Sequence, residues 1–118
     1  MRPVIRIRVH GRSMEPTFHA DDVRWTNPWI YRVRAPRRGE VAVVDHPTRS
    51  LRILKRVVGV PGDVVEGRTL GPDEYYVRGD NLAATTDSDA FGTLPRRAFR
   101  ARVRAPMPLE GALARTRA

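Results

Sequence analysis

The apolar residues of this 118-residue chain recur mainly with a period of two, and this alternation constrains the fold more than any other feature. Residues 4–10 read VIRIRVH, and an alternation of apolar residues with arginine is typical of a half-exposed β-strand. Turn residues such as the Gly-Val-Pro-Gly of 59–62 separate the patterned segments. The strands of 63–67 and 74–81 would be joined around RTLGPD. All the further strands that we expect lie within residues 39–47, 51–63, 63–67, 74–81 and 96–106.

Helical patterns are weak, because no segment longer than about ten residues keeps a 3.6-residue period. Helix is expected only as short turns near 14–20 and 108–115. A chain of this length suits one compact domain rather than two. We therefore predict a single, mainly β domain over residues 1–108, followed by a flexible tail over 109–118.

Composition excludes several kinds of chemistry. The chain has no cysteine, which excludes disulfides, a thiolate nucleophile and cysteine-type zinc sites. Its three histidines, His10, His19 and His46, are not spaced as metal ligands usually are, so we expect no metal and no cofactor. No apolar run of about 18 residues occurs, and residues 1–11 lack the continuous apolar centre of a secretory signal. We expect neither a transmembrane anchor nor a signal peptide, and a cytoplasmic location that includes peripheral contact with a membrane.

The formal net charge of +9 is concentrated at the two ends of the chain. Residues 1–12 carry four arginines and no acid, and residues 96–118 carry seven arginines against one acid, Glu110. Three interpretations stay open: solvated faces of an arginine-rich protein, contact with an anionic membrane through the terminal arginines, and nucleic-acid binding. The few aromatic residues are not interleaved with the basic clusters, so no specific nucleic acid is expected as a partner.

Residues 11–18, GRSMEPTF, hold one of only three serines, Ser13, between an arginine and a methionine. Gly, Ser and Pro are ordinary turn residues, so a turn alone accounts for this segment. A tightly turned segment also suits a nucleophile, because its backbone N–H groups can point at the reacting carbonyl. A second residue able to take the proton from Ser13 would decide between these interpretations.

Lysine occurs once, since the 22 Lys and Arg residues comprise 21 arginines and Lys55. Arginine can replace lysine wherever only charge matters, but a guanidinium does not give up its proton. The retained lysine therefore indicates a position that needs a neutral amine, with chance as the alternative. Strand alternation puts Leu51, Ile53 and Val57 on the same face as Lys55, and desolvation on such a face lowers the pKa of an amine. A lysine made neutral in this way is a general base for a serine hydroxyl.

A histidine is the other candidate base for Ser13. His10 and His19 lie close to Ser13 in the chain, but neither has a carboxylate partner in a recognisable arrangement. A Ser13–Lys55 pair is therefore the preferred interpretation.

Ser13 and Lys55 fall within an ordered set of sequence blocks that resembles the type I signal peptidases, which are serine–lysine peptidases. The blocks are GRSMEPT at 11–17, RRGEVAVVDHP at 37–47, LKRVVGVPGD at 54–63, and VRGDN at 77–81 followed by TTDSDAFG at 85–92. The resemblance covers about residues 9–104 and implies a signal peptidase-like β fold, which the catalytic domain of LexA-type self-cleaving repressors shares. It further implies a serine endopeptidase with Ser13 as nucleophile and Lys55 as general base.

The resemblance also assigns roles to residues around this pair. The backbone N–H of Ser13 would help to hold the oxyanion, and Thr85 stands where the family often has a serine that hydrogen-bonds the lysine. Gly11 stands where some members place a hydroxyl residue that donates to the oxyanion, so its position is a further oxyanion candidate that lacks the hydroxyl. The residues expected to support the site are Met14, Pro16, Arg56, Asp80, Asn81, Asp87 and Ser88.

Two features depart from the family pattern. Asp89 stands where the family usually has an arginine after the Asp-Ser pair, and an acid there cannot pair with Asp87. No membrane anchor precedes Ser13, whereas housekeeping signal peptidases usually have one. Short members that this chain resembles include the maturation proteases of nickel-type superoxide dismutase.

The first functional hypothesis is therefore a serine endopeptidase that removes an N-terminal leader or propeptide from a precursor protein or peptide. A nickel-type superoxide dismutase precursor is one candidate substrate, on the resemblance alone. The alternatives are a catalytically silent or partner-dependent binding module of the same fold, and a basic nucleic-acid-binding β domain that only the charge supports.

Overall fold

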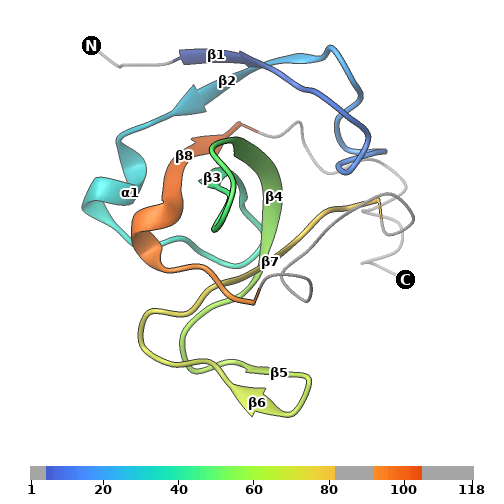
Figure 1. Cartoon of the computed structure of the whole chain (residues 1–118). Coiled ribbons are helices and arrows are strands. Elements are labelled where there is room, and N and C mark those ends of the chain that lie inside the picture. The colour runs from blue at the N-terminus through green and yellow to red at the C-terminus, as the bar shows by residue number, and fades with distance from the viewer. Residues whose placement is uncertain (1–4, 82–91, 105–118) are drawn as a thin grey trace, which may run out of the picture.

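Six strands form one antiparallel sheet with the order β1-β2-β8-β3-β4-β7, and a separate two-stranded hairpin, β5-β6, projects from it (Figure 1). The structure is a computed structural model, and it describes residues 5–81 and 92–104. The strands are β1 (Ile5–Arg8), β2 (Val23–Asn27), β3 (Val41–Asp45), β4 (Arg52–Gly59), β5 (Val64–Val65), β6 (Arg68–Thr69), β7 (Tyr76–Arg78) and β8 (Phe99–Val103). The helical segments are the α-helix α1 (Ile30–Val33) and the 3₁₀ helix η1 (Arg96–Ala98).

The centre of the sheet is the β3-β4 pair, which is rich in valine and isoleucine as buried strands usually are. Val41 pairs with Arg56, and Ala42 pairs with Lys55. On its other side β3 pairs with β8, and β4 pairs with β7, so Lys55 lies on an interior strand of the sheet. The expected single, mainly β fold is confirmed.

Apolar side chains pack on both faces of the sheet, in two clusters. The first, which we call the aromatic cluster, contains Tyr31, Ala42, Val44, Val57, Tyr75, Val77, Leu94, Ala98 and Phe99. The second, which we call the loop cluster, contains Val9, Met14, Phe18, Val41 and Val103. Neighbouring residues of β3 alternate between the clusters, as the period of two requires.

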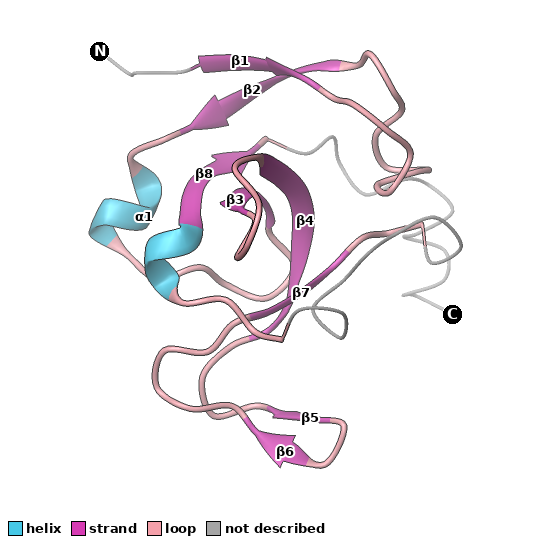
Figure 2. Ribbon diagram, viewed as in Figure 1, coloured by secondary structure: helices cyan, strands magenta, loops and turns pink. Residues whose placement is uncertain are grey.

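The two helical segments cover the aromatic cluster where β8 begins (Figure 2). The ring of Tyr31 in α1 meets Phe99 edge to face at 5.8 Å, and Tyr75 meets Phe99 at 5.3 Å. Leu94 pairs with Tyr75 through two backbone hydrogen bonds of 2.9 Å, which ties η1 to the segment before β7.

Residues 14–20 contain turns, where short turns were expected. Two elements were missed. Residues 23–27 form β2, in which the apolar Val23 and Trp25 are exposed and Thr26 is buried, and residues 30–33 form α1, which is too short to show a period. The connection RTLGPD contains β6, which closes a hairpin onto β5, so β5 does not continue directly toward β7.

Some expected features lie outside the described residues. They are the helical turn near 108–115, the tail over 109–118 and the last residues of the strand expected over 96–106.

Candidate active site

Ser13 lies in the turn that connects β1 to β2, and two buried side chains fix this turn. Met14 is 1% exposed and Phe18 is fully buried, and both belong to the loop cluster. The Phe18 N–H donates to the Met14 carbonyl at 3.0 Å, which closes the turn. Gly11 has a φ of +78°, a conformation that glycine adopts without strain. The half-buried Ser13 is thus held on a tight segment rather than on a loose loop.

A second loop, residues 79–81 after β7, is hydrogen-bonded to the Ser13 turn. The Asn81 backbone N–H donates to the Ser13 carbonyl at 2.7 Å. The Asn81 side-chain Nδ2 donates to the Arg12 carbonyl at 3.0 Å. Because more than 60 residues of sequence separate the two loops, these bonds fix the position of Ser13 relative to the β4-β7 edge of the sheet.

An ion pair between Arg56 and Asp80 joins the same loops to the sheet. Arg56 Nε and Nη2 donate to Asp80 Oδ1 and Oδ2 at 2.9 and 2.8 Å, a bidentate arrangement. Thr17 Oγ1 donates to Asp80 Oδ2 at 2.6 Å. Arg56 Nη1 also donates to the Gly39 carbonyl at 2.7 Å. This network, which we call the loop-anchoring network, ties β4 to the turn that carries Ser13.

Lys55 precedes Arg56 on β4 and is only 3% exposed. By strand alternation its side chain shares a face with Ile53 and Val57, and both of these pack in the aromatic cluster. Leu51, which was also expected on this face, comes before β4 begins and is 39% exposed. An ammonium so deeply buried costs free energy unless it is paired or gives up its proton.

The structure therefore brings several predicted site residues into one region. Arg56, Asp80 and Asn81 contact the segment around Ser13, while Met14 anchors it. Pro16 follows a cis peptide bond within the same turn. The remaining predicted residues, Thr85, Asp87 and Ser88, lie outside the described residues, and so does the departure at Asp89.

The turn also holds a histidine–carboxylate pair that the sequence did not indicate. His19 Nδ1 lies 3.6 Å from Glu15 Oε2, with the His19 side chain 60% exposed. This separation is too long for a hydrogen bond, so Glu15 does not hold the ring in one orientation. The exposed imidazole is a weaker candidate base than the buried Lys55.

A second ion pair, between Arg34 and Glu40, lies just before β3. Arg34 donates both Nη atoms to the two Glu40 oxygens, the longer contact being 3.3 Å, and Tyr31 OH donates to Glu40 Oε1 at 2.9 Å. Burial raises the pKa of Glu40, but hydrogen bonds from Arg34, the Arg37 N–H and Tyr31 outweigh it and hold the pKa below its usual value. Burial, with the charge of Glu40, raises the pKa of Tyr31. We call the hydrogen-bonded set of Tyr31, Arg34, Arg37 and Glu40 the hinge network.

Two contributors to the site were not singled out from the sequence as contacts. Thr17 binds Asp80, and the Gly39 carbonyl binds Arg56. Thr17 lies in the sequence block that contains Ser13, so the sequence drew attention to this segment. Its partner Asp80 lies 63 residues away, so the sequence did not indicate the contact. Within the described residues, no group of three His, Cys, Asp or Glu side chains is arranged to hold a metal ion.

Comparison with known proteins gives the family. Residues 3–70, more than half of the chain, match the signal peptidase family, peptidase S26. Mitochondrial inner membrane protease subunit 2 of Danio rerio is 36% identical over 100 residues, which cover 72% of this chain and 54% of the relative. A probable signal peptidase I-2 of Synechocystis sp. is 35% identical over 122 residues, covering 75% of this chain and 56% of the relative. Human mitochondrial inner membrane protease subunit 1 is 28% identical over 106 residues, which cover 79% of this chain and 63% of the relative.

The chain belongs to the signal peptidase family, peptidase S26. It spans little more than half the length of the first two of these relatives. In the described residues, no helix has the length and apolar character needed to cross a membrane.

Proposed function

We propose that this chain carries the catalytic residues of a serine endopeptidase that removes an N-terminal leader from a precursor protein. The observation that carries the proposal is a buried lysine that directly precedes, on β4, the arginine that anchors the Ser13 turn. Lys55 is 3% exposed on β4, and the next residue, Arg56, anchors the turn of Ser13 through Asp80 and Thr17. Membership of the signal peptidase family supports the same activity.

In the proposed reaction, neutral Lys55 accepts the proton of the Ser13 hydroxyl, and the Ser13 oxygen attacks the carbonyl carbon of the scissile peptide bond. The negative charge on the resulting oxyanion is held by the Ser13 backbone N–H. Lys55 then gives its proton to the leaving amine as the carbon–nitrogen bond breaks. Water, deprotonated by the same amine, hydrolyses the ester and restores Ser13.

Burial supports Lys55 in this role because an apolar environment favours the neutral amine over the ammonium. A model lysine titrates near pH ~10.4, so almost none is neutral at pH 7 without such an environment. Activity should therefore rise with pH through an apparent pKa well below ~10.4. A profile that stays flat from about pH 6 to about pH 9 would contradict a titrating lysine.

The test uses the purified chain, a diverse peptide library and mass spectrometry of the new N-termini. Ser13→Ala and Lys55→Arg should each remove cleavage, a loss on the order of 10⁴-fold or more, the second because guanidinium keeps its proton. Ser50→Ala is the matched control, because Ser50 is exposed on the loop between β3 and β4 and should leave cleavage unchanged. Full activity in Lys55→Arg would overturn the base assignment.

The substrate proposed is the leader of a precursor protein, and the resemblance adds a nickel-type superoxide dismutase precursor as one candidate. Incubating that precursor with the wild type and with Ser13→Ala decides this point. A new N-terminus that forms only with the wild type supports the candidate, and an intact precursor beside a cleaved library peptide removes it. Peptide binding without any cleavage would favour the alternative of a catalytically silent binding module.

We also propose peripheral contact with an anionic membrane. Trp25 and Trp29 are 51% and 45% exposed, and the Arg6 and Arg32 guanidinium groups lie over their rings at 5.6 and 4.2 Å. Such pairs of aromatic and cationic side chains suit the boundary between water and lipid headgroups. Anionic vesicles should bind the chain at low salt and release it at high salt. If the chain instead bound duplex nucleic acid as strongly as anionic vesicles, and that affinity fell steeply with salt concentration, the nucleic-acid alternative would be supported.

A further inference from the structure

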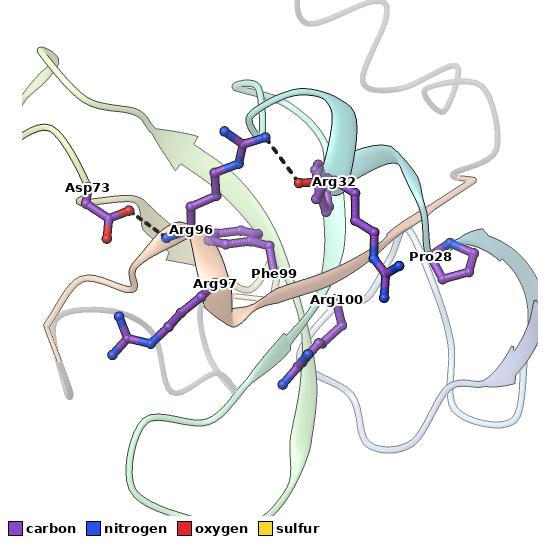
Figure 3. Close-up of a pocket in the computed structure, with 8 residues that line it drawn as sticks. Pro28, Arg32, Asp73, Arg96, Arg97, Phe99 and Arg100 are labelled. Atoms are coloured by element: carbon purple, nitrogen blue, oxygen red, sulfur yellow. Dashed lines mark hydrogen bonds between the residues drawn. The ribbon is translucent and has the colours of Figure 1, made fainter.

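A pocket that has four arginines among its lining residues lies at the other end of the sheet from the Ser13 turn. Its volume is about 580 Å³, and Arg32 lines it from α1 while Arg96, Arg97 and Arg100 line it from η1 and β8 (Figure 3). The strand register gives its place: Val44 pairs with Phe99 beside the pocket, whereas Val41 pairs with Val103 and Arg56 beside the loop-anchoring network.

Two of the four arginines are held in place by the protein. Arg96 Nη2 donates to the Tyr31 carbonyl at 3.1 Å, which orients this guanidinium against α1. Arg100 Nε donates to Asp45 Oδ2 at 2.8 Å, and Asp45 also contacts Arg52 at 3.2 Å. The pocket is therefore built in part by fixed side chains and not only by mobile surface arginines.

Negative charge in this pocket is too small to balance the arginines. One carboxylate, Asp73, lines it, and its Oδ1 already accepts the Arg96 backbone N–H at 2.9 Å. Within residues 5–81 and 92–104, no carboxylate forms an ion pair with Arg32 or Arg97. Arg32 instead stacks on Trp29 at 4.2 Å. Arg100 is paired with Asp45, but the guanidinium groups of Arg32, Arg96 and Arg97 have no ion pair within the described residues, so a bound anion would reduce their mutual repulsion.

We propose that this pocket binds a phosphate group. A phosphate monoester offers three acceptor oxygens and a charge of about −1.5 to −2 at pH 7, so it can accept from guanidinium groups on opposite walls at once. A single carboxylate presents two coplanar oxygens and suits one arginine fork. The planar guanidinium, with its fixed donors, is well suited to phosphate oxygens. Asp73 limits the site, because its free oxygen repels an anion on that side.

The phosphate can come from two sources, a small soluble phosphate or the headgroup of a lipid. Trp29 is 45% exposed and Val33 is 79% exposed near the pocket, so an apolar surface adjoins it. The inference does not depend on peptidase activity, and its test measures binding alone.

The first arm of the test is calorimetric titration of the full chain with inorganic phosphate at low ionic strength. The second arm is flotation with phosphatidylcholine vesicles that contain phosphatidic acid, compared with vesicles that contain oleic acid at the same surface charge. The test variant is Arg32→Gln/Arg97→Gln. The control variant, Arg37→Gln/Arg49→Gln, removes the same formal charge from exposed arginines outside the two terminal groups. Circular dichroism verifies that both variants fold.

We expect saturable binding of at least one phosphate source, weakened about tenfold or more in Arg32→Gln/Arg97→Gln and less than about twofold in the control. Binding of inorganic phosphate identifies a soluble source, and binding only of phosphatidic acid vesicles identifies a lipid source. Equal weakening in both variants, equal binding of oleic acid vesicles, or no saturable binding of either phosphate source would overturn the proposal. A glutamate-rich peptide that binds with the same arginine dependence, without competition from phosphate, would also overturn it.

Discussion

The loop-anchoring network and the hinge network use the same chemical parts for different tasks. Each has an arginine bound through two nitrogens to one carboxylate, a hydroxyl that donates to that carboxylate, and a backbone carbonyl that accepts from the arginine. Arg56 and Asp80 join segments 24 residues apart, and Thr17 lies 63 residues from Asp80. Arg34, Tyr31 and Glu40 all lie within nine residues of one another.

The difference in sequence separation indicates a difference in role. The hinge network fixes one short local segment, so breaking it should lower stability and leave the Ser13 turn in place. The loop-anchoring network fixes two loops relative to β4, so breaking it should displace the Ser13 turn relative to β4. We therefore expect the Arg34–Glu40 ion pair to stabilise one local segment and the Arg56–Asp80 ion pair to position distant loops.

The largest expected effect is on catalysis and comes from Asp80→Asn. The change keeps the size of the side chain but removes the charge that Arg56 and Thr17 share, so the Ser13 turn loses its fixed position. We expect kcat/KM for a cleaved library peptide to fall by about 10²-fold, as a displacement of about 1 Å commonly causes. Glu40→Gln is the matched control, with a change of less than about twofold. Equal losses in the two variants would remove the distinction between the networks.

The second effect is on stability and comes from Glu40→Gln. The Glu40 side chain is 9% exposed and accepts from Arg34, Tyr31 and the Arg37 N–H. Removing its charge leaves Arg34 without its partner, and the free energy of unfolding should fall by about 1–3 kcal/mol. Urea titration measures this change. Since the Asp80 side chain is more exposed, at 17%, Asp80→Asn should cost less, and the reverse order would contradict this ranking.

The third effect is the dependence of stability on pH. Hydrogen bonds hold the pKa of Glu40 below its usual value in the folded state. A lowered folded-state pKa contributes stability above the unfolded value of about 4.3, and this contribution is lost as pH falls through the folded pKa. The melting temperatures of the wild type and Glu40→Gln should therefore converge between about pH 5 and about pH 3. A gap that stays constant over that interval would show that Glu40 contributes through packing alone.

The smallest effect comes from the two hydroxyls. Thr17→Val and Tyr31→Phe each remove one donor to a carboxylate and nearly preserve the shape of the side chain. Each should lower the free energy of unfolding by about 0.5–1.5 kcal/mol. Only Thr17→Val should also lower kcat/KM, because only Thr17 belongs to the turn of Ser13. Comparison of unfolding and peptide cleavage in the two variants separates the effects, and a lower kcat/KM in Tyr31→Phe would count against the comparison.

The strand pattern predicted the sheet well where alternation was long. It predicted β1, β3 and β4, and it put Lys55 with Ile53 and Val57, where the structure buries it. It missed β2, in which the apolar Val23 and Trp25 are exposed and Thr26 is buried, and it missed α1, because a helix of four residues gives too few repeats to show a period. The strand expected over 63–67 contains β5, but β6, which has two residues, and its pairing with β5 were missed.

The sequence singled out candidate site residues but not the contacts between them. Unusual composition singled out Lys55, and the resemblance supplied Ser13, Asp80 and Asn81. No local pattern shows that Thr17 donates to Asp80, because that contact depends on how β4 and β7 bring distant loops together. The catalytic roles of Ser13 and Lys55 stay predictions that the proposed variants test.

The neighbouring positions of Lys55 and Arg56 restrict how this protein can vary in length. Successive residues of a strand face opposite sides, so inserting or deleting one residue in the first half of β4 would exchange the faces of the two cations. The guanidinium would then enter the apolar side, and the amine would replace a bidentate partner of Asp80. The loops around β5-β6 carry no such constraint, since that hairpin pairs only with itself among the described residues. Viable length variants should therefore accumulate at residues 64–69 and be absent from residues 52–56.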